Sequence, residues 1–383
     1  MTQELTRRQL LERAAMGGAA ITFPGILAAC GSSGSKASGG TTSVEQKLAK
    51  TLNFSNWTLY IDTKGSAHPS LDAFQKKTGV HVNYVEDIND NASFFGKIQG
   101  PLSRGQSIDR DIIVLTDNDR YLSLMIKKGW AEKLDKSAIP NFKNLVDVQK
   151  HPNFDPDREY SLPWQSGMSG IAYNDTLTDP VLSVDDLLEN PKLKGKITVL
   201  NSMGDAMTIV MLANGDDPTK VTDKSWNAAF KRIQKAVDNK QIRQFTGNDY
   251  APILARGDLS AAMSWSGDIA QLGNKNIHWN VPEAGGALWT DNMLIPKGGD
   301  VFTASTYMNF VYDPKIAAQI AAYVNYVTPV KGAKEEAAKI DPKLANNPLI
   351  FPDDETLSKV VIFDSKALSN QDYLEKWQTL LGG

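Results

Sequence analysis

The stretch that decides how this chain is organised is Gly285–Pro296, which reads GGALWTDNMLIP. Asp291–Ile295 is predicted to be a short buried strand, which Pro296 ends because proline lacks the N–H that a strand ladder needs. Trp289 and Asp291 are two positions apart, so their side chains point to the same side of an extended chain. An indole face and a carboxylate that share one space suit an organic cation, because the carboxylate pairs with an ammonium group and the ring covers methylene groups. A strand end beside an ordinary core tryptophan is the alternative interpretation.

The composition is that of an ordinary globular protein. Of the 383 residues 41% are hydrophobic and 22% are charged, and this length is sufficient for two domains. The formal net charge is −3, and it becomes −4 without Met1–Ala29, which holds three basic and two acidic residues. This mild negative charge gives no support to nucleic acid as a partner. The histidines are scattered and the single cysteine, Cys30, excludes an internal disulfide, so we expect no metal site and no cofactor.

The N-terminal residues have the pattern of an export signal. Thr6-Arg7-Arg8-Gln9-Leu10-Leu11 resembles the twin-arginine signal of bacteria. The apolar run that follows, Ala14–Ala29, has only sixteen residues, which is short for a helix that spans a membrane. We therefore predict a twin-arginine signal peptide over residues 1–30, with a transmembrane anchor as the alternative.

The end of this segment resembles a lipidation site. Leu27-Ala28-Ala29-Cys30-Gly31 is similar to the lipobox of bacterial lipoproteins, in which the thiol is lipidated and becomes the first residue. A Gly/Ser/Thr-rich tract over residues 31–44 is then predicted to be a flexible tether. We expect an exported protein that is anchored through Cys30 to the outer face of the cytoplasmic membrane.

From Thr51 onward, predicted strands and helices alternate. Val80–Val85 and Ile112–Leu115 have the length and apolar character of strands, and the pattern over Asn91–Gln99 indicates a helix between them. Further strands and helices are predicted at Leu52–Ser55, Leu71–Lys77, Lys196–Leu200, Ala261–Trp265 and Pro314–Val327. This alternation is typical of an α/β fold, in which ligands bind at the carboxyl ends of the strands.

An enzyme is the alternative from another functional class. Gly167-Met168-Ser169-Gly170 approaches the serine elbow of hydrolases, but its spacing is wrong and no histidine lies in a motif that could serve it. Asp185 and Asp186 are a pair of carboxylates of the kind that glycoside cleavage uses. They follow Ser183, however, and the pattern is that of a capping box at the start of a helix. We therefore predict a protein that is not an enzyme.

Five stretches, taken in order, resemble the substrate-binding proteins of spermidine/putrescine ABC transporters, over essentially the whole chain after residue 50. They are Phe54–Tyr60 (FSNWTLY), Asp111–Val114 (DIIV), Tyr160–Trp164 (YSLPW), Met263–Gly267 (MSWSG) and Gly285–Asp291 (GGALWTD). The resemblance implies a periplasmic-binding-protein-like fold of type II, in which two α/β lobes close around a ligand by a hinge. Lobe 1 is expected to hold residues 45–165 plus 292–325, and lobe 2 residues 166–291 plus 326–383.

The same resemblance implies an aromatic box. Its members fall on Trp57 and Tyr60 in lobe 1, on Trp265 and Trp289 in lobe 2, and on Tyr326 near the later crossover. Stacked aromatic faces bury the methylene groups of a polyamine and favour its charges, each contact contributing about 0.5–2 kcal/mol. For Trp57 and Trp265 a plain core position is the alternative. The other tryptophans, apart from Trp164, are predicted to serve packing, whereas Trp164 and Tyr250 leave both roles open.

The resemblance also implies polar contacts to the ligand. Asp291 falls on the carboxylate that pairs with a central amine, and Asp205 on one of two acids that hold a terminal ammonium. Thr58 and Thr116 fall on hydroxyl positions that accept from an amine. For Asp205, which stands at a predicted helix start, stabilisation of the helix dipole is the alternative role.

The chain departs from the family pattern where the second terminal acid falls on Ser202 and a glutamate falls on Leu59. In addition, a family serine falls on Gly247 and a glutamine falls near Phe363. A buried ammonium without an anion costs several kcal/mol. Candidate replacements for the missing carboxylates are Asp117, whose alternative role is a helix cap, Asp249 and Asp268.

These patterns together predict a function. We expect a solute-binding lipoprotein of an ABC importer that binds putrescine, spermidine or a similar cation between its lobes and delivers it to the permease and ATPase subunits. A monomer is expected. The alternative within binding proteins is a receptor for another solute, such as thiamine, an amino-acid-derived cation or an iron chelate. Ferric sites usually contain clustered tyrosines and histidine, and the scattered histidines argue against that last ligand.

Overall fold

One mixed sheet connects the two halves of the part of the chain that the structure describes. The structure is a computed structural model, and it describes residues 47–382. The predicted signal peptide, the lipidation site at Cys30 and the tether therefore lie outside the described residues. The ten strands have the order β2-β1-β3-β9-β4-β7-β5-β6, with β10 beside β9 and β8 beside β4. No helix within residues 47–382 has both the length and the apolar character that crossing a membrane requires.

The strands are β1 Thr51–Trp57, β2 His81–Ile88, β3 Ile112–Thr116, β4 Ser161–Asn174, β5 Ile197–Leu200, β6 Ile242–Thr246, β7 Ala261–Trp265, β8 Ile277–Asn280, β9 Gly286–Leu294 and β10 Val360–Val361. The α-helices are α2 Pro69–Thr78, α3 Asn91–Ser103, α4 Arg120–Lys127, α5 Val184–Glu189, α6 Met203–Ala213, α7 Asp223–Asp238, α8 Tyr250–Ala255, α9 Ser266–Leu272, α10 Val301–Val311, α11 Pro314–Val324, α12 Ala333–Ile340, α13 Asp354–Ser358 and α14 Gln371–Gly382.

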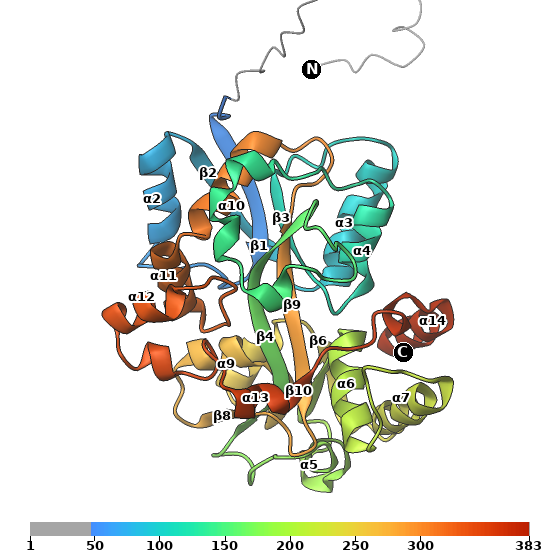
Figure 1. Cartoon of the computed structure of the whole chain (residues 1–383). Coiled ribbons are helices and arrows are strands. Elements are labelled where there is room, and N and C mark those ends of the chain that lie inside the picture. Colours follow the sequence, from blue (N-terminus) through green and yellow to red (C-terminus); the bar gives the residue numbers. More distant parts are fainter. Residues whose placement is uncertain (1–46, 383) are drawn as a thin grey trace, which may run out of the picture. The chain divides into compact units, whose positions relative to one another are not determined.

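Strands β4 and β9 run side by side between the two halves of the sheet (Figure 1). β1, β2 and β3 pair in parallel on one side of this pair of strands, and β5 and β6 do so on the other. Gln165 of β4 lies opposite Asp291 of β9, and the next residue, Ser166, exchanges two backbone hydrogen bonds of 2.8 Å with Val327. The three predicted lobe boundaries, after residues 165, 291 and 325, therefore lie close together at these crossing segments.

Helix α12 suggests a change to the predicted lobes. Residues 326–383 were assigned to lobe 2, but α12 packs against α11, a helix of the predicted lobe 1. The segment before α12 is also bound to that side, because Val146 donates to Pro329 and Lys331 donates to Asn144. We therefore propose that lobe 1 extends through α12, and that the chain returns to lobe 2 after it.

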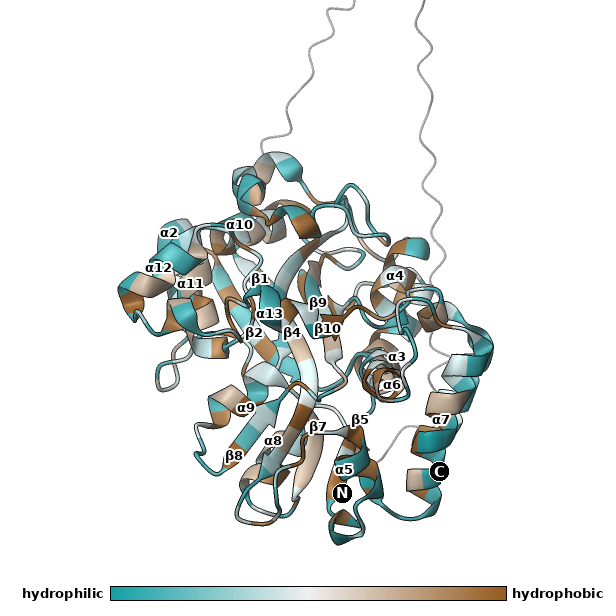
Figure 2. Ribbon diagram, turned by 60° about the horizontal axis from the view of Figure 1, so that its bottom comes forward, coloured by the Kyte–Doolittle hydropathy of each residue, from teal (hydrophilic) through white to brown (hydrophobic). Residues whose placement is uncertain are grey.

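Local sequence signals explain why the helices begin and end where they do. Gly79 ends α2 with a left-handed conformation (φ 77°), and its N–H donates to the carbonyl of Gln75. Thr222 and Ser225 form a capping box at the start of α7, a helix in which hydrophilic and hydrophobic residues alternate in bands (Figure 2). Trp226 and Ile233 lie on the buried face of α7.

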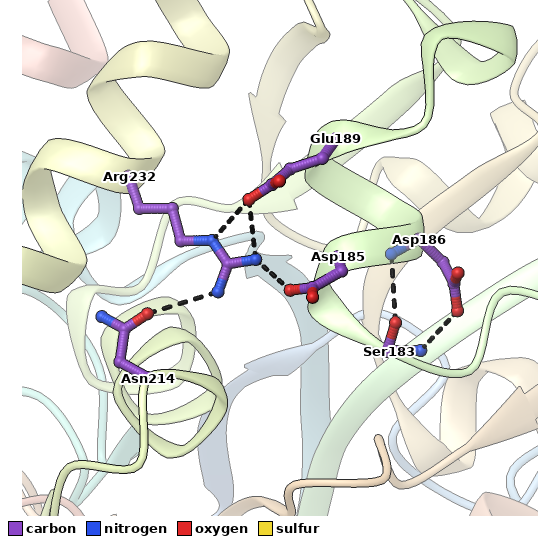
Figure 3. A network of polar contacts seen from close by, with 6 residues as sticks. All are labelled: Ser183, Asp185, Asp186, Glu189, Asn214 and Arg232. Atoms are coloured by element: carbon purple, nitrogen blue, oxygen red, sulfur yellow. Dashed lines mark hydrogen bonds and ion pairs between the residues drawn. The ribbon is translucent and has the colours of Figure 1, made fainter.

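The predicted capping box at Ser183 is confirmed, since Ser183 and Asp186 bond reciprocally at the start of α5. The neighbouring Asp185 is part of an ion-pair network (Figure 3). Its partner is Arg232 of α7, which also pairs with Glu189 of α5 at 2.9 Å and donates to Asn214 at the end of α6 at 3.2 Å. Arg232 therefore joins three helices to one another.

The structure corrects two predicted bounds and adds one strand that the sequence did not predict. β9 begins at Gly286 rather than at Asp291, because it pairs with β4 through the whole of the tryptophan motif. The helix predicted over Pro314–Val327 ends at Val324, since Asn325 adopts a left-handed conformation (φ 56°). β4 was not predicted as a strand, because its side chains are buried on both faces and show no alternation.

Candidate ligand-binding site

A narrow cavity lies where the carboxyl ends of the strands from the two halves face one another. Its lining residues border about 550 Å³ of space that atoms do not fill, which includes space open to solvent. Trp57 ends β1, Thr116 ends β3 and Trp265 ends β7, and all three line it. β9 contributes from the crossing segment. This is the position that open α/β sheets use for ligands.

Ten of the eleven predicted ligand-binding residues line this cavity: Trp57, Thr58, Tyr60, Thr116, Ser202, Asp205, Trp265, Trp289, Asp291 and Tyr326. Asp117 is not among the lining residues. Its Oδ1 accepts from the backbone N–H of Thr290 at 2.8 Å, and its own N–H donates to the carbonyl of Thr290 at 2.9 Å. Burial raises the pKa of Asp117 to about 6. Asp117 therefore fastens the loop after β3 to β9 through its two bonds with Thr290.

The aromatic side chains form a continuous wall. The ring centroids of Trp57 and Trp265 lie 5.9 Å apart, those of Trp265 and Trp289 6.3 Å, and those of Trp289 and Tyr326 5.5 Å. Tyr60 reaches Tyr326 at 5.1 Å. All five residues are buried, yet all line the cavity. The two interpretations of Trp57 and Trp265, core residue and cavity wall, are therefore not exclusive.

Two glycines make room for these rings. Gly167 lies opposite Trp289 in the register of β4 and β9. A Cβ atom at Gly167 would lie 2.4 Å from the Trp289 ring, and one at Gly267 would lie 2.3 Å from the Tyr326 ring. Gly167 belongs to the stretch that approached a serine elbow. In the structure this glycine allows an aromatic side chain to pack against the backbone.

The cavity is lined by acidic side chains. Five aspartates line it, and none of the described residues in its lining is lysine, arginine or histidine. The five are Asp90, Asp119, Asp205, Asp268 and Asp291. Within residues 47–382 no group of three or more acidic, histidine or cysteine side chains has the arrangement of a metal site. Carboxylates beside aromatic faces are the groups that hold an organic cation.

Asp291 is the acid on the crossing strand. It is 3% exposed, and its Oδ1 accepts from the Thr116 hydroxyl at 2.6 Å. Burial raises its pKa to about 7, although the Thr116 bond acts in the other direction. The nearby Tyr60 hydroxyl also lowers the pKa of Asp291, although the two groups are not aligned as a hydrogen bond. Asp291 and Trp289 share the cavity, as their i, i+2 spacing predicts.

Asp205 is held by three donors. Its Oδ1 accepts from Asn118 Nδ2 at 2.9 Å and from the Ser169 hydroxyl at 2.5 Å, and its Oδ2 accepts from Trp265 Nε1 at 3.4 Å. Burial raises its pKa, against the effect of these bonds. Ser169 also accepts from Trp289 Nε1 at 2.9 Å. Ser169 thus fixes an acid and a ring of the cavity.

Asp268, one of the candidate replacements for a missing acid, lies in the lining. It accepts from the hydroxyl groups of Tyr250 and Tyr326, both at 2.7 Å, and from Asn248 at 2.8 Å. Burial raises its pKa. Asp249, another candidate, does not line the cavity, and its carboxylate accepts instead from the backbone N–H of Gly247 at 2.9 Å.

Two further acids of the cavity were missed by the sequence analysis. Asp90 and Asp119 are the N-caps of α3 and α4, with bonds of 2.7 Å to the N–H groups of Ser93 and Arg120. Burial raises the pKa of Asp119 to about 7. Each cap bond engages only Oδ1, so the second oxygen remains available. The signal that could have found them is an aspartate two or three residues after the end of a parallel strand.

Three buried polar atoms of the lining have no hydrogen-bond partner among the described residues. They are Trp57 Nε1, Tyr60 Oη and Asn248 Oδ1. Buried polar atoms are nearly always paired in folded proteins. These three atoms are therefore available to a ligand or to water in the cavity.

The remaining aromatic residues lie outside the lining. Trp226 stacks on Phe230 and Tyr373. Trp164 and Tyr250, which left both roles open, are buried behind the cavity: Trp164 Nε1 donates to the carbonyl of Tyr60, and the Tyr250 hydroxyl accepts from the backbone N–H of Trp265. These two residues therefore hold residues of the cavity wall in place and do not form the surface of the cavity.

A family model of bacterial extracellular solute-binding proteins matches residues 70–352. The chain belongs to this family. The spermidine/putrescine-binding periplasmic protein of Escherichia coli K12 is 27% identical to it over 338 residues, which cover 87% of this chain and 92% of that protein. The putrescine-binding periplasmic protein of the same organism is 30% identical over 350 residues, with coverage of 84% and 87%.

The fold of this solute-binding protein is similar to that of known structures. A spermidine/putrescine ABC transporter structure from Listeria monocytogenes superposes with a TM-score of 0.73 at 26% identity, covering 87% of this chain and 98% of that one. These relatives confirm the predicted resemblance and the two-lobed type II fold. Members of the family bind solutes and are not enzymes. The hydrolase alternative is therefore wrong.

Proposed function

We propose that this protein binds a polyamine, putrescine or spermidine, in the cavity between its lobes and delivers it to the permease and ATPase of an ABC importer. The single observation that carries the proposal is the make-up of the cavity. It combines five aromatic rings with five carboxylates and has no basic side chain among its described lining residues. The rings cover the methylene chain, and the acids pair with the ammonium groups.

The ligand contacts predicted from the sequence remain part of this proposal. Asp291 pairs with an amine in the middle of the cavity, and Asp205 and Asp268 hold amines beyond it. Asp119 supplies a free carboxylate oxygen in addition. The relatives named for spermidine and putrescine support the same ligand class. When the lobes close, water is excluded and each ion pair becomes stronger in the lower dielectric.

Isothermal titration calorimetry with putrescine and spermidine tests the proposal. The purified protein should bind at least one of them, and Asp291→Asn should weaken binding by about 2 kcal/mol or more, because a charge-assisted bond is lost in a closed site. Failure of the wild type to bind either amine would overturn the proposal. Native mass spectrometry of the protein as purified should reveal a bound small amine.

One observation favours a second ligand class. The unpaired Trp57 Nε1 is a donor, and an ammonium group has no acceptor to offer it. A cation that also carries a carbonyl or carboxylate oxygen, as amino-acid-derived cations do, would satisfy this atom. Arginine and agmatine in the same titration distinguish the two classes: tight binding of arginine alone would favour the second.

The N-terminal segment has a proposed role of its own. We infer that the chain is exported by the twin-arginine route and is anchored as a lipoprotein through Cys30, as a monomer. The motifs around Arg7, Arg8 and Cys30 support this. Cys30→Ser should move the exported protein from the membrane fraction to the soluble fraction, and replacement of both arginines by lysine should stop export. Analytical ultracentrifugation of the purified protein tests the monomer.

A further inference from the structure

Loops of the two lobes meet at two glycines on the rim of the cavity. Gly204 lies in the first turn of α6, beside Asp205, and Gly247 follows β6. An ideal Cβ atom at Gly204 would lie 2.2 Å from the carbonyl oxygen of Asn118, and one at Gly247 would lie 2.3 Å from the carbonyl oxygen of Asn89. Both carbonyl groups belong to loops of the opposite lobe, after β3 and β2.

We propose that Gly204 and Gly247 are positioning residues that set how far the two lobes close. The backbone of the opposite lobe lies where a side chain at either position would be, so the close approach of the lobes in this structure requires glycine at both. This inference rests on the proposed function, because its readout is the affinity for a polyamine.

The loop that meets Gly204 has little freedom to move away. Asp117 fastens it to β9 through the two bonds with Thr290, and Asp119 caps α4 directly after it. The obstacle at Gly204 is therefore a fixed backbone carbonyl rather than the end of a flexible side chain.

The approach of the lobes at Gly204 also brings Asn118 and Asp205, two residues that line the cavity, into contact. Asn118, whose carbonyl lies against Gly204, donates its side-chain amide to Asp205 across the cavity at 2.9 Å. Ordinary contact of a Cβ atom begins at 3.4 Å, so an alanine at 204 would need about 1.2 Å more space than the 2.2 Å present. A retreat of that size would break the bond from Asn118 to Asp205 and separate the two walls.

At Gly247 the contact is similar. The N–H of Asn248 approaches the carbonyl of Asn89 at 3.4 Å, and the Asn89 side-chain amide lies 2.9 Å from the position of a Cβ at 247. Neither Gly204 nor Gly247 has a positive φ. Alanine at these positions is therefore free of backbone strain, and its effect comes from the opposing loop.

Gly204→Ala and Gly247→Ala test the inference, with Gly96→Ala as the matched control. Gly96 is a helical glycine of α3 with open space around its Cβ position. Calorimetry with putrescine and spermidine should show affinity lowered at least tenfold in Gly204→Ala and Gly247→Ala, and unchanged in Gly96→Ala. X-ray scattering at saturating amine should give a larger radius of gyration for the first two than for the wild type.

Thermal unfolding of the ligand-free proteins separates closure from folding. Alanine is a better helix former than glycine, so Gly204→Ala should melt at the wild-type temperature or above it while it binds more weakly. Wild-type affinity and wild-type radius in both Gly204→Ala and Gly247→Ala would overturn this inference and leave the proposed function standing. A wild type that binds neither amine would overturn the proposed function itself.

Discussion

The environment of Asp291 disfavours the ionised form of its carboxyl group. It is buried on the crossing strand, with the hydroxyl of Thr116 as its bonded partner. The acids Asp117 and Asp205 add repulsion to the effect of burial, and the pKa of Asp291 rises to about 7. An aspartate in the unfolded chain has a pKa of about 3.9. The ligand-free folded protein therefore binds more protons than the unfolded chain between these two values.

The sign of the resulting pH dependence follows from this difference in bound protons. Stability falls as pH rises wherever the folded state holds the extra proton, so Asp291 makes the ligand-free protein less stable as pH increases from about 4 to about 7. Asp291→Asn removes this contribution. Its unfolding free energy relative to the wild type should improve as pH rises and level off above about pH 7, by at most about 1.4 kcal/mol per pH unit. Urea titrations from pH 5 to 8 measure it, and a difference that stays constant with pH would contradict the pKa shift.

Trp289 tests the aromatic wall at a single residue. Its ring lies between Trp265 and Tyr326, and Ser169 fixes its indole N–H. Trp289→Ala should weaken polyamine binding by about 1–2 kcal/mol, because a cation loses one aromatic face in a desolvated site. Calorimetry checks this. Trp130→Ala is the control, since Trp130 stacks on Phe95 away from the cavity, and its affinity should remain that of the wild type.

At the scale of the elements, the sequence predicted those that carry a local signal. The strand at Ala261–Trp265 has the bounds that its apolar run predicts, and α6 begins where Ser202 caps it. β4 could not be found in the same way. It is buried on both faces along most of its length, and only its pairing with β9, β7 and β8 defines it as a strand. Such pairings join residues more than 80 positions apart.

The residues of the candidate site also form two groups, those that a sequence motif identifies and those whose role only the fold reveals. Residues that belong to a motif, such as Trp265 and Asp291, could be assigned from the sequence by resemblance. Ser169 could not, because its role depends on a register that places it beside Asp205 and Trp289 at once. Asp119 was overlooked because a helix cap is a sufficient local reason for an aspartate, and only the fold brings the opposite lobe near it.

The network around Arg232 predicts an effect on folding without an effect on binding. Arg232 joins α5 to α7 through Asp185 and Glu189 and reaches the end of α6 through Asn214 (Figure 3). None of these residues lines the cavity. Arg232→Gln should lower the free energy of unfolding by up to about 1 kcal/mol, because the partner acids are largely exposed to solvent. Denaturant titration measures this loss, and a change in polyamine affinity would show that the network is connected to the site.

At the scale of the whole molecule, the site exists only when both halves of the sheet are in place. Trp57 and Asn118 come from one half, and Trp265 and Asp205 come from the other, yet they contact one another around one cavity. Each half supplies some of the rings and some of the acids, so neither half alone completes the cavity. A ligand that pairs with these groups therefore stabilises the closed form of the folded protein, and it has no comparable site in the unfolded chain.

A ligand that binds only the folded protein shifts the folding equilibrium toward that state, and this gain in stability can be measured. At a hundred times its dissociation constant, a ligand that binds only the folded state raises the free energy of unfolding by about 2.7 kcal/mol. The melting temperature at pH 8 should therefore rise steadily with the logarithm of the spermidine or putrescine concentration. At pH 6 the rise should be smaller, because Asp291 and Asp119, with pKa values of about 7, are then protonated and must lose a proton before they pair with an ammonium group. Sodium chloride at matched ionic strength is the control. An equal shift from this salt would mean that the amines act by general screening of charge rather than by occupation of the cavity.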